Sequence, residues 1–308
     1  MPRVAVDDTY LTLVTSRRRF TTIDLLPLKH SVHPLSSIRP VVVVTGASAG
    51  LGLAIAKTFL ENGYDVVGIG RDPSRLQAAA VSLAQRRPHQ AEGRFVPQAA
   101  DVADAASVND AFARIADELG RIDVLINCVG KSDRGRVMAL SPSRLAELFD
   151  ANVTTTLLCS QAALPLLKTS QGVVVNIGSL AAKVGARHLG GYPAAKHALA
   201  GLTQQMRLEW REFGVHVALV SPGPIRRDDE GQRYQDQIQD QGLPASAMRP
   251  GGGASIKGLP PQWIAEQVLK CVYSRTPDII LPRYARWMIA LGHLWPAAGD
   301  WLLLRMTK

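Results

Sequence analysis

The chain has few cysteines, no long apolar run and no cluster of basic and aromatic residues, and each shortage excludes a class of protein. Its three cysteines, Cys128, Cys159 and Cys271, lie far apart without CxxC spacing, which argues against a disulfide framework or a metal site and indicates a reducing compartment. No stretch reaches the roughly 18 apolar residues of a membrane span, and the N-terminus lacks the basic and then apolar order of a secretory signal. We therefore expect a cytoplasmic protein that is soluble or attached to a membrane only at its surface.

Basic residues outnumber acidic ones, with 35 Lys and Arg against 26 Asp and Glu and a formal net charge of +9. Such a balance suits anionic ligands, an acidic carrier protein or an anionic membrane surface. Nucleic acid is not predicted as a partner, because the chain has no basic helix with recognition spacing and no aromatic and basic platform. A content of 46% hydrophobic residues predicts a globular body with a substantial core.

Residues 1–39 differ in character from the rest of the chain. They are of mixed polarity, with an arginine run at 17–19 and no sustained hydrophobic period. A targeting segment is disfavoured because such segments are poor in acidic residues, whereas this one contains adjacent aspartates. We interpret these residues as an N-terminal extension, either a flexible tail or the result of a start site placed too far upstream.

From residue 40 onward, short β-branched runs alternate with longer helical patterns, which is typical of a parallel sheet covered by helices on both faces. The predicted strands are 41–45, 65–69, 95–98, 124–127, 173–177, 215–220 and 279–281. The predicted helices are 50–62, 74–87, 105–119, 143–168, 192–213 and 262–274. This succession predicts one α/β domain over 40–282, a doubly wound Rossmann-type sheet of about seven strands that binds ligands beyond the carboxyl ends of its strands.

Two segments depart from this alternation. Residues 226–260 repeat Gln and Asp and contain three consecutive glycines, and we interpret them as a lid over the substrate or as a disordered surface insertion. Residues 283–308 form an amphipathic C-terminal tail that holds three of the five tryptophans. A tail of this composition can rest on a bilayer, edge the substrate pocket, or pack on its own domain or on a partner subunit.

A glycine-rich turn follows the first predicted strand. It reads Thr45-Gly46-Ala47-Ser48-Ala49-Gly50-Leu51-Gly52. Glycine permits a tight turn and a close backbone approach, and the N-terminus of the next helix offers unpaired N–H groups and a positive dipole to a pyrophosphate. Strand, turn and helix in this order predict a dinucleotide site, and glycines that merely turn the chain are the alternative.

Residues after the next strands refine the cofactor prediction. The second strand ends without the Asp or Glu that an NAD-preferring site places there, and Arg71 follows it. Arg71 can bond a 2′-phosphate, so NADP(H) is favoured over NAD(H); the alternative is a surface arginine paired with a neighbouring acid. Asp101, before Val102, can accept a bond from an adenine amino group or cap the next helix. Gly130, after Asn127, lets the backbone pass close to a cofactor or simply ends the strand.

Ser179, Tyr192 and Lys196 carry the predicted chemistry. Tyr192 and Lys196 are four residues apart in a helical stretch, so the phenol and the ammonium share one face. Ketone reduction needs a proton donor, and a nearby ammonium would lower the ordinary tyrosine pKa of about 10. Ser179 can hold the carbonyl oxygen, and Asn152 can bind a water that feeds the lysine. Each residue alone has an ordinary structural explanation, but together with the glycine-rich turn they indicate a nicotinamide-dependent oxidoreductase.

These motifs resemble those of the short-chain dehydrogenase/reductase family, and the resemblance extends from residue 40 to about residue 282. It implies a tyrosine acid/base, a serine that steadies substrate, a lysine that also holds the nicotinamide ribose, and an asparagine in a water relay. The implied catalytic residues are Asn152, Ser179, Tyr192 and Lys196. The implied cofactor contacts are Thr45, Gly46, Ser48, Gly50, Leu51, Gly52, Arg71, Asp101, Val102, Asn127, Gly130, Tyr192, Lys196, Pro222, Gly223 and Ile225. The chain departs from the family at Arg227, which stands where a threonine is usual.

The sequence therefore predicts an NADP(H)-dependent enzyme that reduces a carbonyl to a secondary alcohol, with Tyr192 as the proton donor. The resemblance implies a 3-oxoacyl thioester or another lipid-like ketone as substrate, and a homodimer or homotetramer paired through helices 143–168 and 192–213. The arginine pair 226–227 can meet a cofactor phosphate, an anionic substrate or water. A non-catalytic NADP(H)-binding sensor or scaffold is the alternative, although the presence of both Tyr192 and Lys196 argues against it.

Overall fold

The computed structural model describes residues 39–85, 93–227, 232–249, 251–253 and 257–306. All of them belong to one unit of the chain, Ile38–Lys308. The extension predicted over 1–39 lies outside the described residues except for its last residue, as do parts of the segment 226–260.

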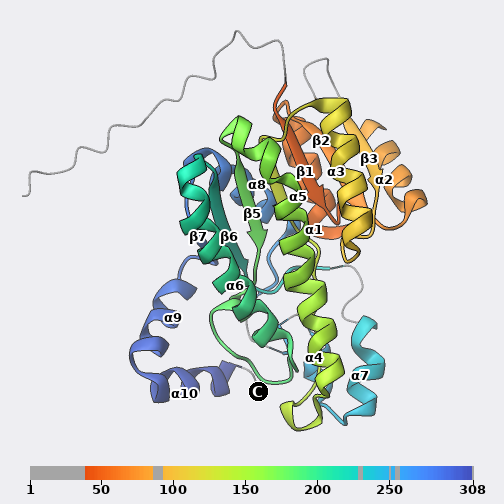
Figure 1. Ribbon diagram of the computed structural model, residues 1–308. Coiled ribbons are helices and arrows are strands. Elements are labelled where there is room, and N and C mark those ends of the chain that lie inside the picture. Colours follow the sequence, from red (N-terminus) through yellow and green to blue (C-terminus); the bar gives the residue numbers. More distant parts are fainter. Residues whose placement is uncertain (1–38, 86–92, 228–231, 250, 254–256, 307–308) are drawn as a thin grey trace, which may run out of the picture. The chain divides into compact units, whose positions relative to one another are not determined.

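In the described residues, seven parallel strands form one sheet in the order β3-β2-β1-β4-β5-β6-β7 (Figure 1). They are β1 (Val41–Thr45), β2 (Asp65–Gly70), β3 (Phe95–Ala99), β4 (Val124–Asn127), β5 (Val173–Ile177), β6 (His216–Pro222) and β7 (Asp278–Leu281). The four valines of β1 are at most 3% exposed, as expected for a β-branched run at the centre of a parallel sheet. The strand order reverses between β1 and β4, where doubly wound sheets bind ligands. The predicted fold class is confirmed.

Helices cover both faces of this sheet (Figure 1). One face carries α1 (Gly50–Glu61), α2 (Pro73–Gln85) and α8 (Pro261–Ser274). The other carries α3 (Ala105–Leu119), α5 (Thr155–Ser170) and α6 (Tyr192–Glu209). Phe59 and Ile264 belong to the core under the first layer, and Phe112 and Leu167 belong to the core under the second. Two apolar cores thus hold the strand ends and helix starts in fixed positions, which is what a binding site beyond the strands requires.

The helix predicted over 143–168 is not a single α-helix. It consists of α4 (Pro142–Phe149), a π-helical turn (Asp150–Thr154) and α5. Ser141 caps α4, because its hydroxyl accepts a hydrogen bond from the N–H of Arg144 at 3.1 Å. The π-turn contains Asn152, and π-turns inside helices frequently occur at functional sites.

The described part of segment 226–260 folds against the loop that follows β4. It contains α7 (Gln235–Asp240) between two short 3₁₀ turns, Gln232–Tyr234 and Ala245–Met248. The side-chain oxygen of Gln237 accepts a hydrogen bond from the N–H of Arg134, and that of Gln241 accepts one from Arg136, both at 3.0 Å. A small apolar cluster closes beneath them, formed by Tyr234, Ile238, Leu243 and Ala247.

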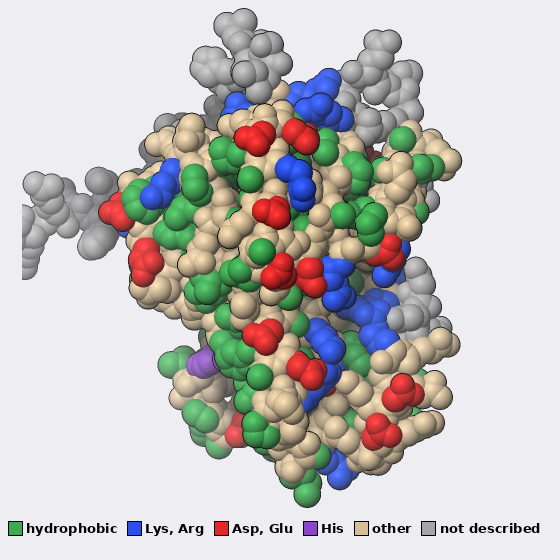
Figure 2. Space-filling model, turned by 45° about the vertical axis from the view of Figure 1, so that its right-hand side comes forward, with side chains coloured by type: hydrophobic (Ala, Val, Ile, Leu, Met, Phe, Trp, Pro, Cys, Tyr) green, Lys and Arg blue, Asp and Glu red, His purple; other side chains and the backbone are tan. Residues whose placement is uncertain are grey.

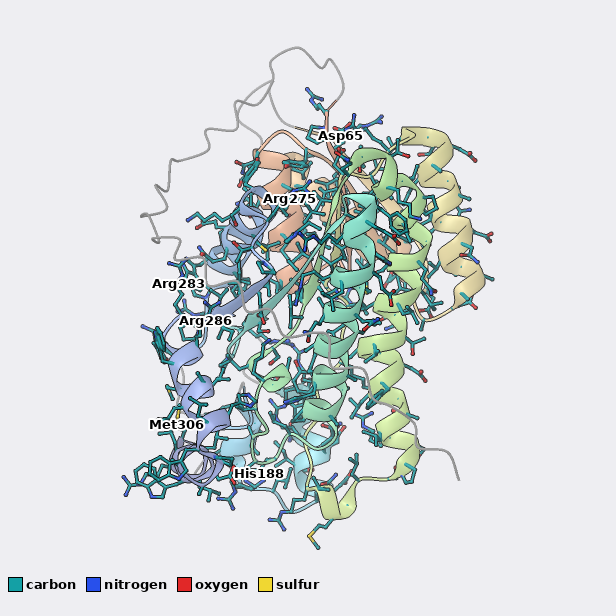
Figure 3. All side chains as sticks on the ribbon, turned by 60° about the vertical axis from the view of Figure 1, so that its left-hand side comes forward. Asp65, His188, Arg275, Arg283, Arg286 and Met306 are labelled. Carbon is teal, nitrogen blue, oxygen red and sulfur yellow. The ribbon has the colours of Figure 1, made fainter. Side chains whose placement is uncertain are left out.

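The C-terminal residues form two helices, α9 (Ala285–Leu294) and α10 (Pro296–Met306), which we call the C-terminal hairpin. It lies beyond the carboxyl ends of the strands (Figure 1). Arg286 donates a hydrogen bond to the carbonyl oxygen of Asp278 at 3.0 Å, which fixes the first helix to β7. In Figure 3, Arg286 lies at the end of the hairpin nearest the sheet and Met306 at the opposite end. No helix among the described residues is long and apolar enough to cross a membrane.

Candidate active site

The glycine-rich turn between β1 and α1 forms the floor of a groove. Gly46 and Gly50 have φ of +72° and +56°, a region that side chains disfavour. A Cβ on Gly52 would lie 2.2 Å from the carbonyl oxygen of Gly46, so the turn can close only with glycine there. No side chain caps the N-terminus of α1 at Ala49, which leaves the first N–H groups of that helix available to an anion.

The groove runs from this turn to Lys196 and has a volume of about 580 Å³. The residues that line it are Gly46, Ala49, Gly50, Leu51, Gly52, Arg75, Cys128, Gly130, Ser132, Asn152, Ile177, Gly178, Tyr192, Lys196, Ile225, Arg226, Arg227, Arg233 and Pro261. Five of these described residues are Arg or Lys and none is acidic, so the lining favours a polyanion. Figure 2 shows basic side chains gathered at the middle right of one face of the molecule.

Tyr192 and Lys196 lie at the end of the groove, at the start of α6. The Nζ of Lys196 is 5.9 Å from the ring centre of Tyr192 and donates a hydrogen bond to the carbonyl oxygen of Ile177 at 3.0 Å. Only 4% of the lysine is exposed. Burial lowers the pKa of Lys196 to about 8, because the charged form loses its hydration.

Asn152 faces the same lysine from the π-turn. Its side-chain nitrogen donates to the carbonyl oxygens of Lys131 and Leu148, at 2.9 and 2.8 Å. Its Oδ1 is fully buried and has no hydrogen-bond partner among the described residues. A Cβ on Gly130 would lie 2.7 Å from this oxygen and 3.3 Å from the Nζ of Lys196, so glycine keeps open the space between them. An unpaired acceptor beside a buried cation is a suitable place for a bridging water.

Ser179 lies directly after β5 and contacts the phenol. Its hydroxyl caps a short 3₁₀ turn by accepting from the N–H of Ala181 at 3.1 Å, and it also hydrogen-bonds the side chain of Tyr192. We expected the lysine charge to lower the pKa of Tyr192. In this structure burial raises that pKa, and it outweighs the opposing effects of the Ser179 hydrogen bond and of the charges on Arg227 and Arg134.

A second cavity, the substrate pocket, opens on the other side of Tyr192 and has a volume of about 170 Å³. Its lining is mostly apolar and includes Leu180, Ala181, Val184, Leu189, Met248, Leu303 and Met306. Ser179 and Tyr192 line it as well, and Tyr192 therefore borders both the groove and the substrate pocket. Pro222, Gly223 and Ile225 also line it, and Ile225 is shared with the groove.

Several predicted cofactor residues make other contacts in this structure. Thr45 is buried, and its hydroxyl accepts hydrogen bonds from the N–H groups of Cys128 and Val129 at 2.9 and 3.2 Å, which ties β1 to the loop after β4. Asn127 is also buried and donates to Ser160 and Asn176, at 2.9 and 2.8 Å. Neither residue lines the groove, and both hold neighbouring strands and the loop after β4 in place.

The remaining predicted residues do not line the groove. Asp101 accepts a hydrogen bond from the N–H of Ala103 at 3.0 Å, and the cap of α3 is Asp104 instead. Val102 is part of the second apolar core. Ser48 is half-buried and Arg71 is exposed. Within the described part of the chain Arg71 has no acidic partner, since the neighbouring aspartate caps α2.

Sequence reasoning missed Arg75, Ser132, Arg134 and Tyr234. Arg75 lines the groove from the first turn of α2. Tyr234 lines the substrate pocket, and its hydroxyl bonds that of Ser132. The guanidinium of Arg134 stacks on the Tyr234 ring at 3.8 Å and donates to the carbonyl oxygen of Ala247 at 2.6 Å. Tyr234 lies within the Gln and Asp repeat, which gave no reason to select it. The sequence around Arg134 does not indicate which distant segment this loop residue contacts.

Three features of the groove suit a nicotinamide dinucleotide: the uncapped N-terminus of α1, the glycines that allow a close backbone approach, and the basic lining. Among the residues that the structure describes, no group of His, Cys, Asp and Glu side chains is placed to hold a metal ion. Fold and site together define a dinucleotide-binding oxidoreductase of the Rossmann type. The model of the short chain dehydrogenase family matches residues 40–238, and the chain belongs to the short-chain dehydrogenase/reductase family.

Similar sequences and a similar solved structure support this family assignment. Dehydrogenase/reductase SDR family member 7B of Danio rerio is 30% identical over 271 residues, which cover 83% of this chain and 82% of that protein. Oxidoreductase BOA17 of Botryotinia fuckeliana is 30% identical over 245 residues, covering 77% of this chain and 86% of that protein. The structure of an alcohol dehydrogenase from Thermococcus sibiricus, complexed with 5-hydroxy-NADP, superposes with a TM-score of 0.65 at 25% identity, covering 79% of this chain and 96% of that one.

Proposed function

We propose that this protein is an NADP(H)-dependent carbonyl reductase or alcohol dehydrogenase in which Tyr192 transfers the proton. One observation carries the proposal: Tyr192 borders both the basic groove and the apolar pocket, with Ser179 hydrogen-bonded to its side chain and the Nζ of Lys196 5.9 Å from its ring centre. A group in that position can exchange a proton with a molecule in the pocket while a dinucleotide occupies the groove.

The nicotinamide ring supplies or accepts the hydride when the cofactor is bound. In the reducing direction, the hydroxyl of Ser179 donates a hydrogen bond to the substrate carbonyl and orients it. Tyr192 gives its phenolic proton to the same oxygen as negative charge develops there. The Ser179 hydrogen bond and the charges on Arg227 and Arg134 favour the resulting phenolate, and a water held by the unpaired oxygen of Asn152 beside Lys196 returns the proton.

NADP(H) is the proposed cofactor, with NAD(H) as the weaker one. The end of β2 has no acidic residue for the ribose hydroxyls, and it is followed by Arg71. Arg75, in the first turn of α2, lines the groove and supplies a second guanidinium four residues after Arg71. Two guanidinium groups near a phosphate supply charge-assisted hydrogen bonds that an NAD(H) ribose cannot use. The alcohol dehydrogenase named above was solved with an NADP derivative, which supports this preference.

The proposed substrate is a lipid-like ketone such as a 3-oxoacyl thioester. The substrate pocket is lined mostly by apolar side chains, with Arg134 and Arg227 also in its lining, and the apolar part favours a hydrocarbon body next to the carbonyl. The described residues of the segment 226–260 act as its lid, because Tyr234 and Met248 border the pocket and Arg134 fastens these residues to the loop after β4.

The proposed enzyme works in the cytoplasm as a homodimer or homotetramer that pairs through α5 and α6. Leu208 on α6 is 64% exposed, as expected for a helix that another subunit covers. The C-terminal hairpin makes peripheral contact with membranes. Its outward tryptophans, Trp287, Trp295 and Trp301, are 55% to 77% exposed, and the guanidinium of Arg305 stacks on Trp301 at 4.1 Å, which suits an anionic bilayer surface.

A screen of ketones with each cofactor tests the proposed function. The purified full-length protein is mixed with a panel of methyl ketones and 3-oxoacyl thioesters, and the absorbance of NADPH or NADH is followed. We expect turnover of at least one lipid-like ketone, with kcat/KM at least about tenfold higher for NADPH because charge-assisted bonds to a phosphate are worth that much. Tight NADPH binding with no turnover of any ketone or alcohol would instead support a sensor or scaffold.

A further inference from the structure

A separate cavity of about 270 Å³ lies beneath the C-terminal hairpin, and we call it the inner chamber. Its wall on the hairpin side includes Met288, Ile289 and Leu302, all half-buried, and its wall on the body side includes Val184 and Gly185. The polar side chains of His293 and Asp300 are exposed and belong to its rim, while the half-buried Lys183 forms an ion pair with Asp278. The chamber is thus an apolar space with a polar edge, which suits a hydrocarbon chain.

The hairpin is built to hold this space open. Its two helices cross at Gly292 and Gly299, where a Cβ on Gly299 would lie 2.7 Å from the Cα of Gly292. The ring Nε2 of His293 lies 3.1 Å from the carbonyl oxygen of Lys183, which fixes the far end of α9 to the body of the protein. The close crossing keeps the roof rigid, and the two anchors at β7 and Lys183 prevent it from collapsing onto the chamber.

The inner chamber adjoins the substrate pocket. Four residues line both spaces: Leu180, Val184, Leu303 and Met306. Each space alone is smaller than the roughly 300 Å³ at which pockets for drug-sized ligands begin, whereas the two together exceed it. When the carbonyl end of a ligand lies at Tyr192, the rest of its chain can therefore extend into the inner chamber.

We propose that the inner chamber receives the apolar chain of the ketone substrate and that the C-terminal hairpin sets the accepted chain length. The inference rests on the proposed function, since it takes the ketone carbon at Tyr192 as its starting point. It assigns a specificity role to a segment that lies outside the family match at 40–238. A short ketone would fill only the substrate pocket, and a long one would extend past Leu303 into the chamber.

A chain-length series with a blocked chamber tests this inference. Ile289 lines the inner chamber but not the substrate pocket, and Leu291, on the same helix, is 52% exposed. We would measure kcat/KM for methyl ketones from butanone to dodecanone with wild type, Ile289→Trp and the matched control Leu291→Trp. Gly185→Phe provides a second obstruction from the opposite wall, where a Cβ meets no heavy atom within 4 Å.

Wild type should gain about fourfold in kcat/KM for each added methylene up to a limiting length, as burial of one CH₂ predicts. Ile289→Trp and Gly185→Phe should lose at least about tenfold with dodecanone and keep their activity with butanone, while Leu291→Trp resembles wild type. Equal dodecanone activity in all four proteins would overturn the proposed chamber and leave the proposed function intact.

A binding measurement separates the chamber from catalysis. Dodecan-2-ol is titrated calorimetrically into each protein, where burial of its chain should give a negative heat-capacity change in wild type and Leu291→Trp that is reduced in both blocked variants. If no ketone is turned over, the proposed function is wrong, and this titration still shows whether the inner chamber binds an apolar chain. The same heat-capacity change in all four proteins would refute it.

Discussion

Replacing Lys196 by methionine should abolish activity and stabilise the protein at neutral pH. The lysine is 4% exposed, and burial lowers its pKa from 10.5 to about 8. A shift of that size corresponds to about 3 kcal/mol of unfavourable desolvation when the ammonium is charged. Methionine has a similar shape and no charge, but it loses the charge-assisted hydrogen bond to Ile177, worth about 1.5 kcal/mol. We therefore expect the free energy of unfolding to rise by about 1.5 kcal/mol at pH 7.

The pH dependence of stability separately tests whether Lys196 destabilises the folded protein at neutral pH. Below pH 8 the lysine is protonated in both the folded and the unfolded state, so wild type carries the full penalty. Between pH 8 and 10.5 the unfolded state binds more protons than the folded state, and wild-type stability therefore rises relative to the variant. Urea denaturation of both proteins across this range should show the stability gap closing. A variant that is less stable than wild type at pH 7, or a gap that widens with pH, would refute the reasoning.

Three further predictions concern the cofactor, the lid and the hairpin. Arg71→Ala and Arg75→Ala should each weaken NADPH binding at least about tenfold in a fluorescence titration and leave NADH binding unchanged; equal losses for both cofactors would contradict a phosphate contact. Arg134→Met removes the bond to Ala247 and should raise the ketone KM about tenfold with little change in NADPH affinity, and an unchanged KM would mean that the lid does not depend on this arginine. Replacing Trp287, Trp295 and Trp301 by serine should greatly reduce sedimentation of the protein with anionic liposomes. Tyr273→Ser on α8 is the control for loss of an exposed aromatic side chain. Sedimentation of the triple variant equal to wild type, or no sedimentation of wild type, would contradict the membrane contact.

The fold could be predicted because its signals are local. Most strands are short β-branched runs between turns, with β3 as an exception, and the predicted bounds of β1, β4 and β5 match the structure while the others differ by one or two residues. The prediction failed inside 143–168, where a π-turn replaces helical geometry around Asn152. The periodicity of apolar residues does not reveal a turn with one extra residue, because the apolar pattern resumes in the helix after that turn.

The candidate site was predictable where a residue follows a strand, and less so where it depends on packing. Ser179 and the glycine-rich turn come directly after β5 and β1, so their positions follow from the topology. Asn127 is the last residue of β4, yet its side chain enters a buried network. The contacts of Tyr234 and Leu303 with the substrate pocket arise from segments distant in sequence, which spacing alone does not reveal.

Turnover by Tyr192→Phe tests the central claim most directly. The ketone with the highest kcat/KM is assayed with NADPH for wild type and the variant, and the NADPH dissociation constant of each is measured by fluorescence. Loss of a positioned proton donor predicts that kcat falls by about 10²-fold to 10⁴-fold, while NADPH affinity stays close to that of wild type. Turnover by the variant within a few-fold of wild type would contradict the role of Tyr192 as the proton donor.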